Sequence, residues 1–150
     1  MLTDLSKRLK SLMESEKISR RALAIKTQNQ RKSILNWLEG HYYPRYDALI
    51  RLADFFKVSC DYLLGESNAY DLANDNECLI EEVPNIFRER LKDYLATEQI
   101  SMYQLAKRLN IEQSTLSKWM NCGSMPEVAI LIRLSKEMDE SVDYLLGRGY

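Results

Sequence analysis

One pentapeptide occurs twice in this chain and constrains how the rest can fold. Asp-Tyr-Leu-Leu-Gly stands at residues 61–65 and again at residues 143–147, an offset of 82 positions. At that offset and without a gap, 20 of the 61 positions from Leu5 to Gly65 are identical to those from Phe87 to Gly147. A solenoid repeat is usually shorter, at ~20–50 residues. The sequence therefore predicts two small domains, residues 1–65 and 87–150, joined by residues 66–86.

The charge of the chain is unevenly distributed, although the net charge is only −1. Residues 1–65 hold 12 Lys and Arg against 7 Asp and Glu, and residues 87–150 hold 9 of each sign. Residues 66–86 hold 6 acidic residues and no basic one. This acidic segment, rich in Ser and Asn, is typical of a linker. The basic first segment favours a polyanionic partner.

Composition narrows the fold and the function classes. Gly and Pro number only 5 and 3, which argues against an all-β chain with many tight turns. No apolar run approaches the ~20 residues that span a bilayer, and nothing near the start resembles an export signal, so we expect a cytoplasmic protein. Cys60, Cys78, Cys122 and the single His41 form no metal-binding pattern. Without a catalytic set or a Gly-rich phosphate loop, we expect no enzyme activity, cofactor or metal.

Polar caps followed by apolar residues at helical spacing predict five helices in each unit, and so an all-α fold. Thr3, Ser19 and Ser59 are expected caps in the first unit, and Asn85, Ser101 and Ser141 in the second. The third helices are predicted at residues 30–39 and 112–121, with Trp37 and Trp119 in the core. Other residues expected to face inward include Leu5, Leu9, Leu12, Met13, Ala22, Leu23 and Ile25. Of each leucine pair, 63–64 and 145–146, one is expected in the core and the other partly exposed.

The order of these elements resembles the Cro/CI-type helix-turn-helix family, the xenobiotic-response-element family of bacterial and phage regulators. The first unit has Leu23-Ala24, a third helix ending in Trp37…Gly40, Pro44, Leu-Ile-Arg-Leu-Ala at 49–53 and a closing segment from Ser59 to Gly65. The second unit has all but two of these residues: Cys122 replaces the Gly and Ser135 replaces the Ala. The resemblance implies two tandem five-helix, lambda-repressor-like DNA-binding domains.

The resemblance also implies roles for single residues, because a helix of this family enters the major groove of double-stranded DNA. The base-reading positions fall on Gln30, Arg31, Lys32 and Asn36, and in the second unit on Glu112, Gln113, Ser114 and Lys118. The phosphate-contacting positions fall on Arg20, Tyr42, Tyr43 and Arg45, and in the second unit on Tyr103, Asn121 and Ser124. A homodimer through the C-terminal helices of the domains is a further implied partner. No small-molecule ligand is indicated.

The two copies depart from the family pattern in different places. The second unit keeps the apolar residue that joins the two helices of the motif, as Ile111, whereas the first has Gln28-Asn29 there. The second unit instead places Glu112 and Glu127 near the expected DNA face. Two hypotheses stay open. Either both units read DNA, which predicts a bipartite, non-palindromic site, or the first binds DNA while the second mediates dimerisation or a protein contact of the antitoxin or anti-repressor kind.

Overall fold

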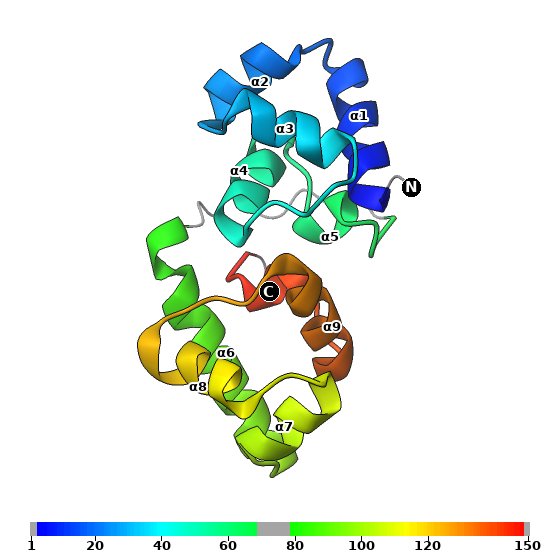
Figure 1. The fold of residues 1–150 in the computed structure, drawn as a ribbon. Helices are drawn as coiled ribbons and strands as arrows, with labels where there is room; N and C mark the ends of the chain where they lie inside the picture. Colours follow the sequence, from blue (N-terminus) through cyan, green and yellow to red (C-terminus); the bar gives the residue numbers. More distant parts are fainter. Residues whose placement is uncertain (1–2, 69–78, 149–150) are drawn as a thin grey trace. The chain divides into compact units, whose positions relative to one another are not determined.

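The computed structural model of the chain describes residues 3–68 and 79–148. Within these residues the chain forms ten α-helices and one 3₁₀ helix and no strand, which confirms the predicted all-α fold. The chain divides into two compact units, Met1–Asp75 and Asn76–Tyr150 (Figure 1). Residues 69–78 of the predicted acidic linker, with Cys78, lie outside the described residues.

The first unit packs five helices around one apolar core. They are α1 (Asp4–Ser15), α2 (Arg20–Thr27), α3 (Arg31–Leu38), α4 (Tyr46–Phe56) and α5 (Cys60–Leu63). α3 packs against both α1 and α2, and α5 packs against α1 and α4. The largest fully buried side chains of this unit are Leu5, Leu9, Leu23, Ile34, Leu49, Ile50, Leu52 and Leu63. α3 is therefore held on its inner side, and its outer side stays open.

The second unit has the same order of helices after a 3₁₀ turn, Ile80–Glu82. They are α6 (Val83–Glu98), α7 (Met102–Leu109), α8 (Gln113–Cys122), α9 (Val128–Met138) and α10 (Val142–Leu145). α8 packs against α6 and α7, and α10 against α6 and α9. Phe87 meets the buried Trp119 edge to face, with ring centroids 6.0 Å apart. Trp37 is buried in the first unit as well, so both tryptophans are core residues as expected.

Serine and threonine caps fix where five of the ten α-helices in the described residues begin. Thr3, Ser19 and Ser59 each accept a hydrogen bond from a backbone N–H in the first turn, as predicted, and so do Ser101 and Ser141. Asn85 was wrongly predicted as a cap, because α6 begins at Val83 after Glu82. Val83 is fully buried and Pro84 is tolerated in a first helical turn, so the helix starts earlier.

Burial departs from the predictions at three sites. Leu5, Leu9, Leu12 and Met13 are buried as expected, but Ile25 is 69% exposed. Ile25 lies about 200° around α2 from the buried Leu23, because a helix turns about 100° per residue. In both leucine pairs, 63–64 and 145–146, both residues are buried, against the prediction. α5 and α10 are single turns that each pack against two longer helices, which cover both leucines, while Tyr62 and Tyr144 stay partly exposed.

The closing glycines hold the last helix of each unit against the first. Gly65 and Gly147 have φ of +82° and +79°, in the left-handed region that favours glycine. A Cβ at Gly65 would lie 2.4 Å from Cβ of Asp4, and one at Gly147 would lie 2.8 Å from Cδ1 of Ile86. A side chain at Gly65 would therefore press on Cβ of Asp4 in α1, whereas one at Gly147 would require the end of the Ile86 side chain in α6 to move.

Candidate nucleic-acid interface

α2 and α3 are joined by a turn whose backbone recurs between α7 and α8. Gln28 ends α2 with φ 56°, and Asn110 ends α7 with φ 55°. The next residue donates its backbone N–H to an alanine oxygen one turn back, Asn29 to Ala24 and Ile111 to Ala106, at 3.0 Å in both units. The two helix-turn-helix segments therefore share one backbone geometry although their turn side chains differ.

In the first unit polar side chains take the place of the apolar contact at this turn. Asn29 is half-buried, and its Nδ2 donates to Oγ1 of Thr27 at 2.9 Å. Thr27 Oγ1 in turn donates to the backbone oxygen of Leu23 at 2.7 Å. From α4, Arg51 donates through Nε to the backbone oxygen of Thr27 at 2.9 Å and through Nη2 to Oδ1 of Asn29 at 2.8 Å. The missing apolar residue is thus replaced by a connected hydrogen-bond network.

The corresponding arginine of the second unit makes the corresponding bond. Arg133, 82 residues after Arg51, donates through Nη2 to the backbone oxygen of Leu109. Neither Arg51 nor Thr27 was predicted to have a role. The sequence could have pointed to Arg51, because the same charged residue recurs at the repeat offset as Arg133.

In the first unit, the starts of α2, α3 and α4 carry five exposed cations: Arg20, Arg21, Arg31, Lys32 and Arg45. A helix N-terminus already bears partial positive charge, so a cation there is unfavourable by about 0.3–1 kcal/mol unless an anion lies nearby. Arg45 has such an anion in part, since its Nε lies 3.8 Å from Oδ1 of Asp47 in the first turn of α4. Neither Gln30 before α3 nor Arg45 before α4 caps its helix through a side-chain hydrogen bond, which leaves backbone N–H groups available. Such helix starts bind phosphate-like anions. Arg21 was not predicted, although the repeat pairs it with Tyr103.

The second unit has carboxylates at the residues directly before its third and fourth helices, where the first unit has a neutral and a cationic side chain. Glu112 is the residue before α8 and Glu127 the residue before α9, where the first unit has Gln30 and Arg45. A carboxylate at a helix N-terminus is favourable without any ligand and repels phosphate. Oγ of Ser114 donates to Oε2 of Glu112 at 3.3 Å, so a residue predicted to read bases is hydrogen-bonded to the carboxylate.

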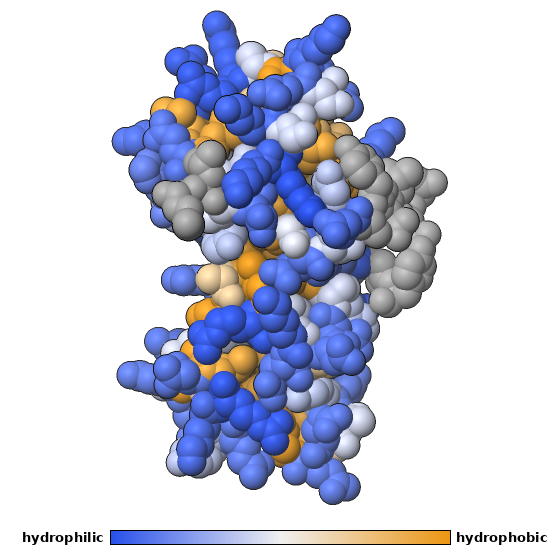
Figure 2. Space-filling model, turned by 90° about the vertical axis from the view of Figure 1, so that its right-hand side faces the viewer, coloured by the Kyte–Doolittle hydropathy of each residue, from blue (hydrophilic) through white to orange (hydrophobic). Residues whose placement is uncertain are grey.

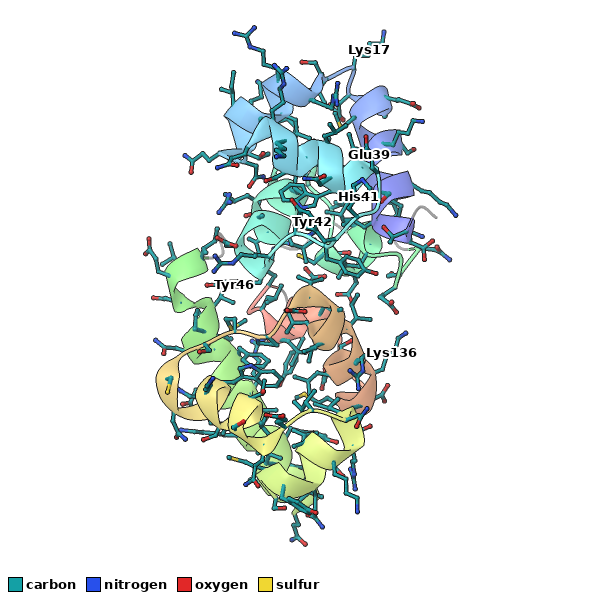
Figure 3. All side chains as sticks on the ribbon, in the orientation of Figure 1. Lys17, Glu39, His41, Tyr42, Tyr46 and Lys136 are labelled. Atoms are coloured by element: carbon teal, nitrogen blue, oxygen red, sulfur yellow. The ribbon has the colours of Figure 1, made fainter. Side chains whose placement is uncertain are left out.

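The remaining predicted residues lie at several places on the two units. Tyr42 is 54% exposed and Tyr43 is half-buried. Asn36, also half-buried, donates from Nδ2 to the Tyr42 hydroxyl at 3.0 Å. Figure 3 shows Glu39, His41 and Tyr42 around the C-terminal end of α3, where His41 Nε2 lies 2.8 Å from Glu39 Oε2. The exposed predicted residues of the second unit are Tyr103, Gln113, Ser114, Lys118, Asn121 and Ser124.

Hydrophilic residues cover much of the visible face of each unit (Figure 2). Over the described residues, no group of three or more His, Cys, Asp and Glu side chains is placed to hold a metal ion. Cys60 is buried and Cys122 is exposed. No helix in the described part of the chain combines the length and apolar character needed to cross a membrane.

Comparison with models of known families finds a match within the second unit. Residues 91–145 match the model of the family described as helix-turn-helix. The match runs from within α6 to the end of α10 and includes the whole α7–turn–α8 segment. The first unit lies outside the match. No curated protein and no solved structure matches the chain.

Proposed function

We propose that this chain is a sequence-specific DNA-binding transcription regulator and that its first unit is the main DNA reader. Residues 91–145, in the second unit, match the helix-turn-helix family. The family match indicates a DNA-binding regulator. It lies in the second unit, whereas the residues best suited to phosphate lie in the first. We therefore infer that the first unit is a second copy of the same domain.

One observation carries this proposal: five cations stand at the starts of three helices in the first unit, on a helix-turn-helix backbone like that of the matched unit. Arg20, Arg21 and Arg45 are the proposed phosphate contacts, together with Tyr42 and Tyr43. Phosphate contacts fix the position of α3 and make the affinity depend on salt. In this arrangement Arg31 offers a bidentate donor to guanine, while Gln30, Lys32 and Asn36 face neighbouring base edges.

The second unit has two candidate roles. In one, α8 reads a different half-site through Gln113, Ser114 and Lys118, so that the complete site is bipartite and non-palindromic. In the other, the second unit mediates dimerisation or a protein contact. The second role is favoured by Glu112 and Glu127, which stand where phosphate contacts would be needed. Dimerisation through α5 or α10 would use residues other than their paired leucines, which are buried.

Selection of bound sites from random double-stranded DNA tests the proposal, followed by affinity measurements over a range of salt concentrations. We expect one enriched, non-palindromic sequence and an affinity that falls steeply with salt. Loss of all enrichment, or an affinity that salt does not change, would contradict DNA reading.

Paired variants separate the two roles of the second unit. Arg31→Ala/Lys32→Ala should reduce affinity for the selected site by at least about tenfold, because a lost base contact alone amounts to about 1–3 kcal/mol. If Gln113→Ala/Lys118→Ala has as large an effect, both units read DNA. If it has none, the second unit has the contact role.

A further inference from the structure

A single side-chain hydrogen bond connects the outer side of α3 to the loop that follows it. Asn36 donates from Nδ2 to the hydroxyl of Tyr42 at 3.0 Å. The loop itself is fixed to the helix by its backbone, since Gly40 N–H donates to Trp37 O at 3.2 Å and His41 N–H to Asn36 O at 3.0 Å. This is the Schellman pattern of helix termination, with Gly40 at φ 77°. The Tyr42 hydroxyl is therefore held beside Asn36 by the end of the helix.

This bond changes which hydrogen-bond pattern Asn36 can offer to a base. An asparagine amide has two N–H donors and one carbonyl acceptor. Tyr42 occupies one donor and fixes the orientation of the amide, which leaves one donor and the acceptor Oδ1. Adenine presents one acceptor, N7, and one donor, N6–H, in the major groove, whereas guanine presents the two acceptors N7 and O6. The remaining groups of Asn36 complement adenine and not guanine.

We propose that Tyr42 is a positioning residue that restricts Asn36 to adenine, so that the first unit rejects guanine at one position of its site. This inference rests on the proposed function, because it assumes that α3 enters the major groove. The hydroxyl accepts from Asn36 and keeps its own hydrogen available for a phosphate oxygen. One tyrosine thus connects a backbone contact to a base-reading residue.

The second unit has no counterpart of this arrangement. The residues at the repeat offset are Lys118 and Ser124. α8 continues to Cys122 and ends at Gly123, so the loop leaves the helix later than in the first unit. Among the hydrogen bonds of the described residues, none joins Lys118 to Ser124. The restriction therefore belongs to the first unit alone.

The experiment measures discrimination between adenine and guanine at one position by the full-length chain. Sites selected from random DNA by the wild type and by Asn36→Ala first identify the position whose preference depends on Asn36. Fluorescence anisotropy at one fixed salt concentration then gives the affinity of each variant for duplexes that differ only there. The variants are wild type, Tyr42→Phe, Tyr43→Phe and Ser124→Ala. Tyr42→Phe removes only the hydroxyl of an exposed ring, and circular dichroism checks that the helices remain.

We expect the wild type to favour adenine over guanine by roughly 5- to 150-fold. Tyr42→Phe frees the second N–H of Asn36 and should bring the ratio to within about twofold, because one amide can then serve either base. Tyr43→Phe and Ser124→Ala should leave the ratio unchanged, whatever they do to the affinity for both duplexes.

Three results would overturn the inference while the proposed function stands. The first is that Tyr42→Phe lowers the affinity for both duplexes equally and keeps the ratio, and the second is that Asn36→Ala alters no base preference. The third is that the wild type prefers guanine, which would mean that the Tyr42 hydroxyl donates to Oδ1 of Asn36 instead. Absence of salt-sensitive DNA binding by the wild type would be a different failure, that of the proposed function itself.

Discussion

Arg51 and Thr27 are joined by a hydrogen bond of 2.9 Å from the guanidinium Nε to a backbone oxygen, across 24 residues of sequence. The bond connects α4 to the turn that sets the angle between α2 and α3. Nη2 of the same arginine holds Asn29 at 2.8 Å, so one side chain fixes both ends of the turn. The position of α3, and with it the proposed DNA-reading surface, therefore depends on a residue that itself lies on α4.

Substitution of Arg51 should destabilise the first unit. Arg51→Ala removes two hydrogen bonds from a charged donor and an ion pair in which Nη1 lies 3.5 Å from Oδ2 of Asp47. We expect the free energy of unfolding to fall by about 2–3 kcal/mol. The chain has two tryptophans, Trp37 and Trp119, one in each unit, so Trp37 fluorescence in a Trp119→Phe background reports urea unfolding of the first unit alone.

Arg133→Ala is the matched control in the second unit, read through Trp119 in a Trp37→Phe background. Arg133 has the bond to Leu109, and Ile111 is half-buried at the turn as an apolar residue, so the loss should be smaller, about 1–2 kcal/mol. Equal losses in the two units would show that neither the network around Asn29 nor the ion pair of Arg51 with Asp47, in whose place the second unit has Ala129, adds to the shared bond.

The parts of this fold that were predictable are those that leave a local or periodic trace in the sequence. Ser19 and Ser101 cap the helices directly after them, and Leu5 and Leu9 repeat at helical spacing, so the elements and their inner faces follow from short windows. The repetition within the sequence is itself visible at the offset of 82 residues.

Contacts between residues far apart in sequence leave no such trace. Nothing near Asn29 indicates that Arg51 will satisfy its amide, and nothing near Asn36 indicates that Tyr42 will take one of its donors. Of the predicted site residues, the sequence could mark which positions face outward on the third helices. It could not show which of these side chains form hydrogen bonds within the protein that limit what else they can bind.

The glycines at positive φ should differ in their tolerance of alanine. Gly65→Ala adds a Cβ 2.4 Å from Cβ of Asp4 in addition to backbone strain, whereas Gly123, at φ 71°, has no atom within 4 Å of that position. Left-handed backbone alone disfavours alanine by about 1–2 kcal/mol. We expect a loss of this size for Gly123→Ala and a larger one for Gly65→Ala, measured by urea unfolding with the tryptophan of each unit. Comparable losses would show that α1 moves aside without strain.

The stability of the second unit should depend on the ionisation of Tyr94. Burial, followed by the charges of Glu137 and Glu98, raises the pKa of the Tyr94 hydroxyl above its usual 10.0. The folded unit therefore holds this proton more tightly than the unfolded chain. The resulting stabilisation is fully present below pH 10.0 and is lost as the pH rises through the folded pKa.

Tyr94→Phe removes this contribution. We expect the difference in free energy of unfolding between wild type and Tyr94→Phe to be constant below pH 10 and to shrink at higher pH, measured through Trp119 fluorescence. Lysines that titrate in the same range affect both proteins equally and cancel in the difference. A difference that does not change with pH would contradict the raised pKa.

Reversal of one charge tests whether the second unit meets DNA at all. Glu127 and Arg45 occupy the same position before α9 and α4, and neither caps its helix through a side chain. Glu127→Arg removes a favourable carboxylate and adds an unfavourable cation, so it should cost about 0.6–2 kcal/mol, twice the roughly 0.3–1 kcal/mol of a single charge at a helix start. If the second unit binds DNA in the register of the first, the new arginine gains a phosphate contact, and the slope of log affinity against log salt concentration steepens by about 0.9.

Glu140→Arg is the control: it makes the same change of charge at an exposed residue after α9 and measures the effect of net charge alone. Equal slopes for Glu127→Arg and Glu140→Arg would place the start of α9 away from the duplex, and the second unit would then have the protein-contact role.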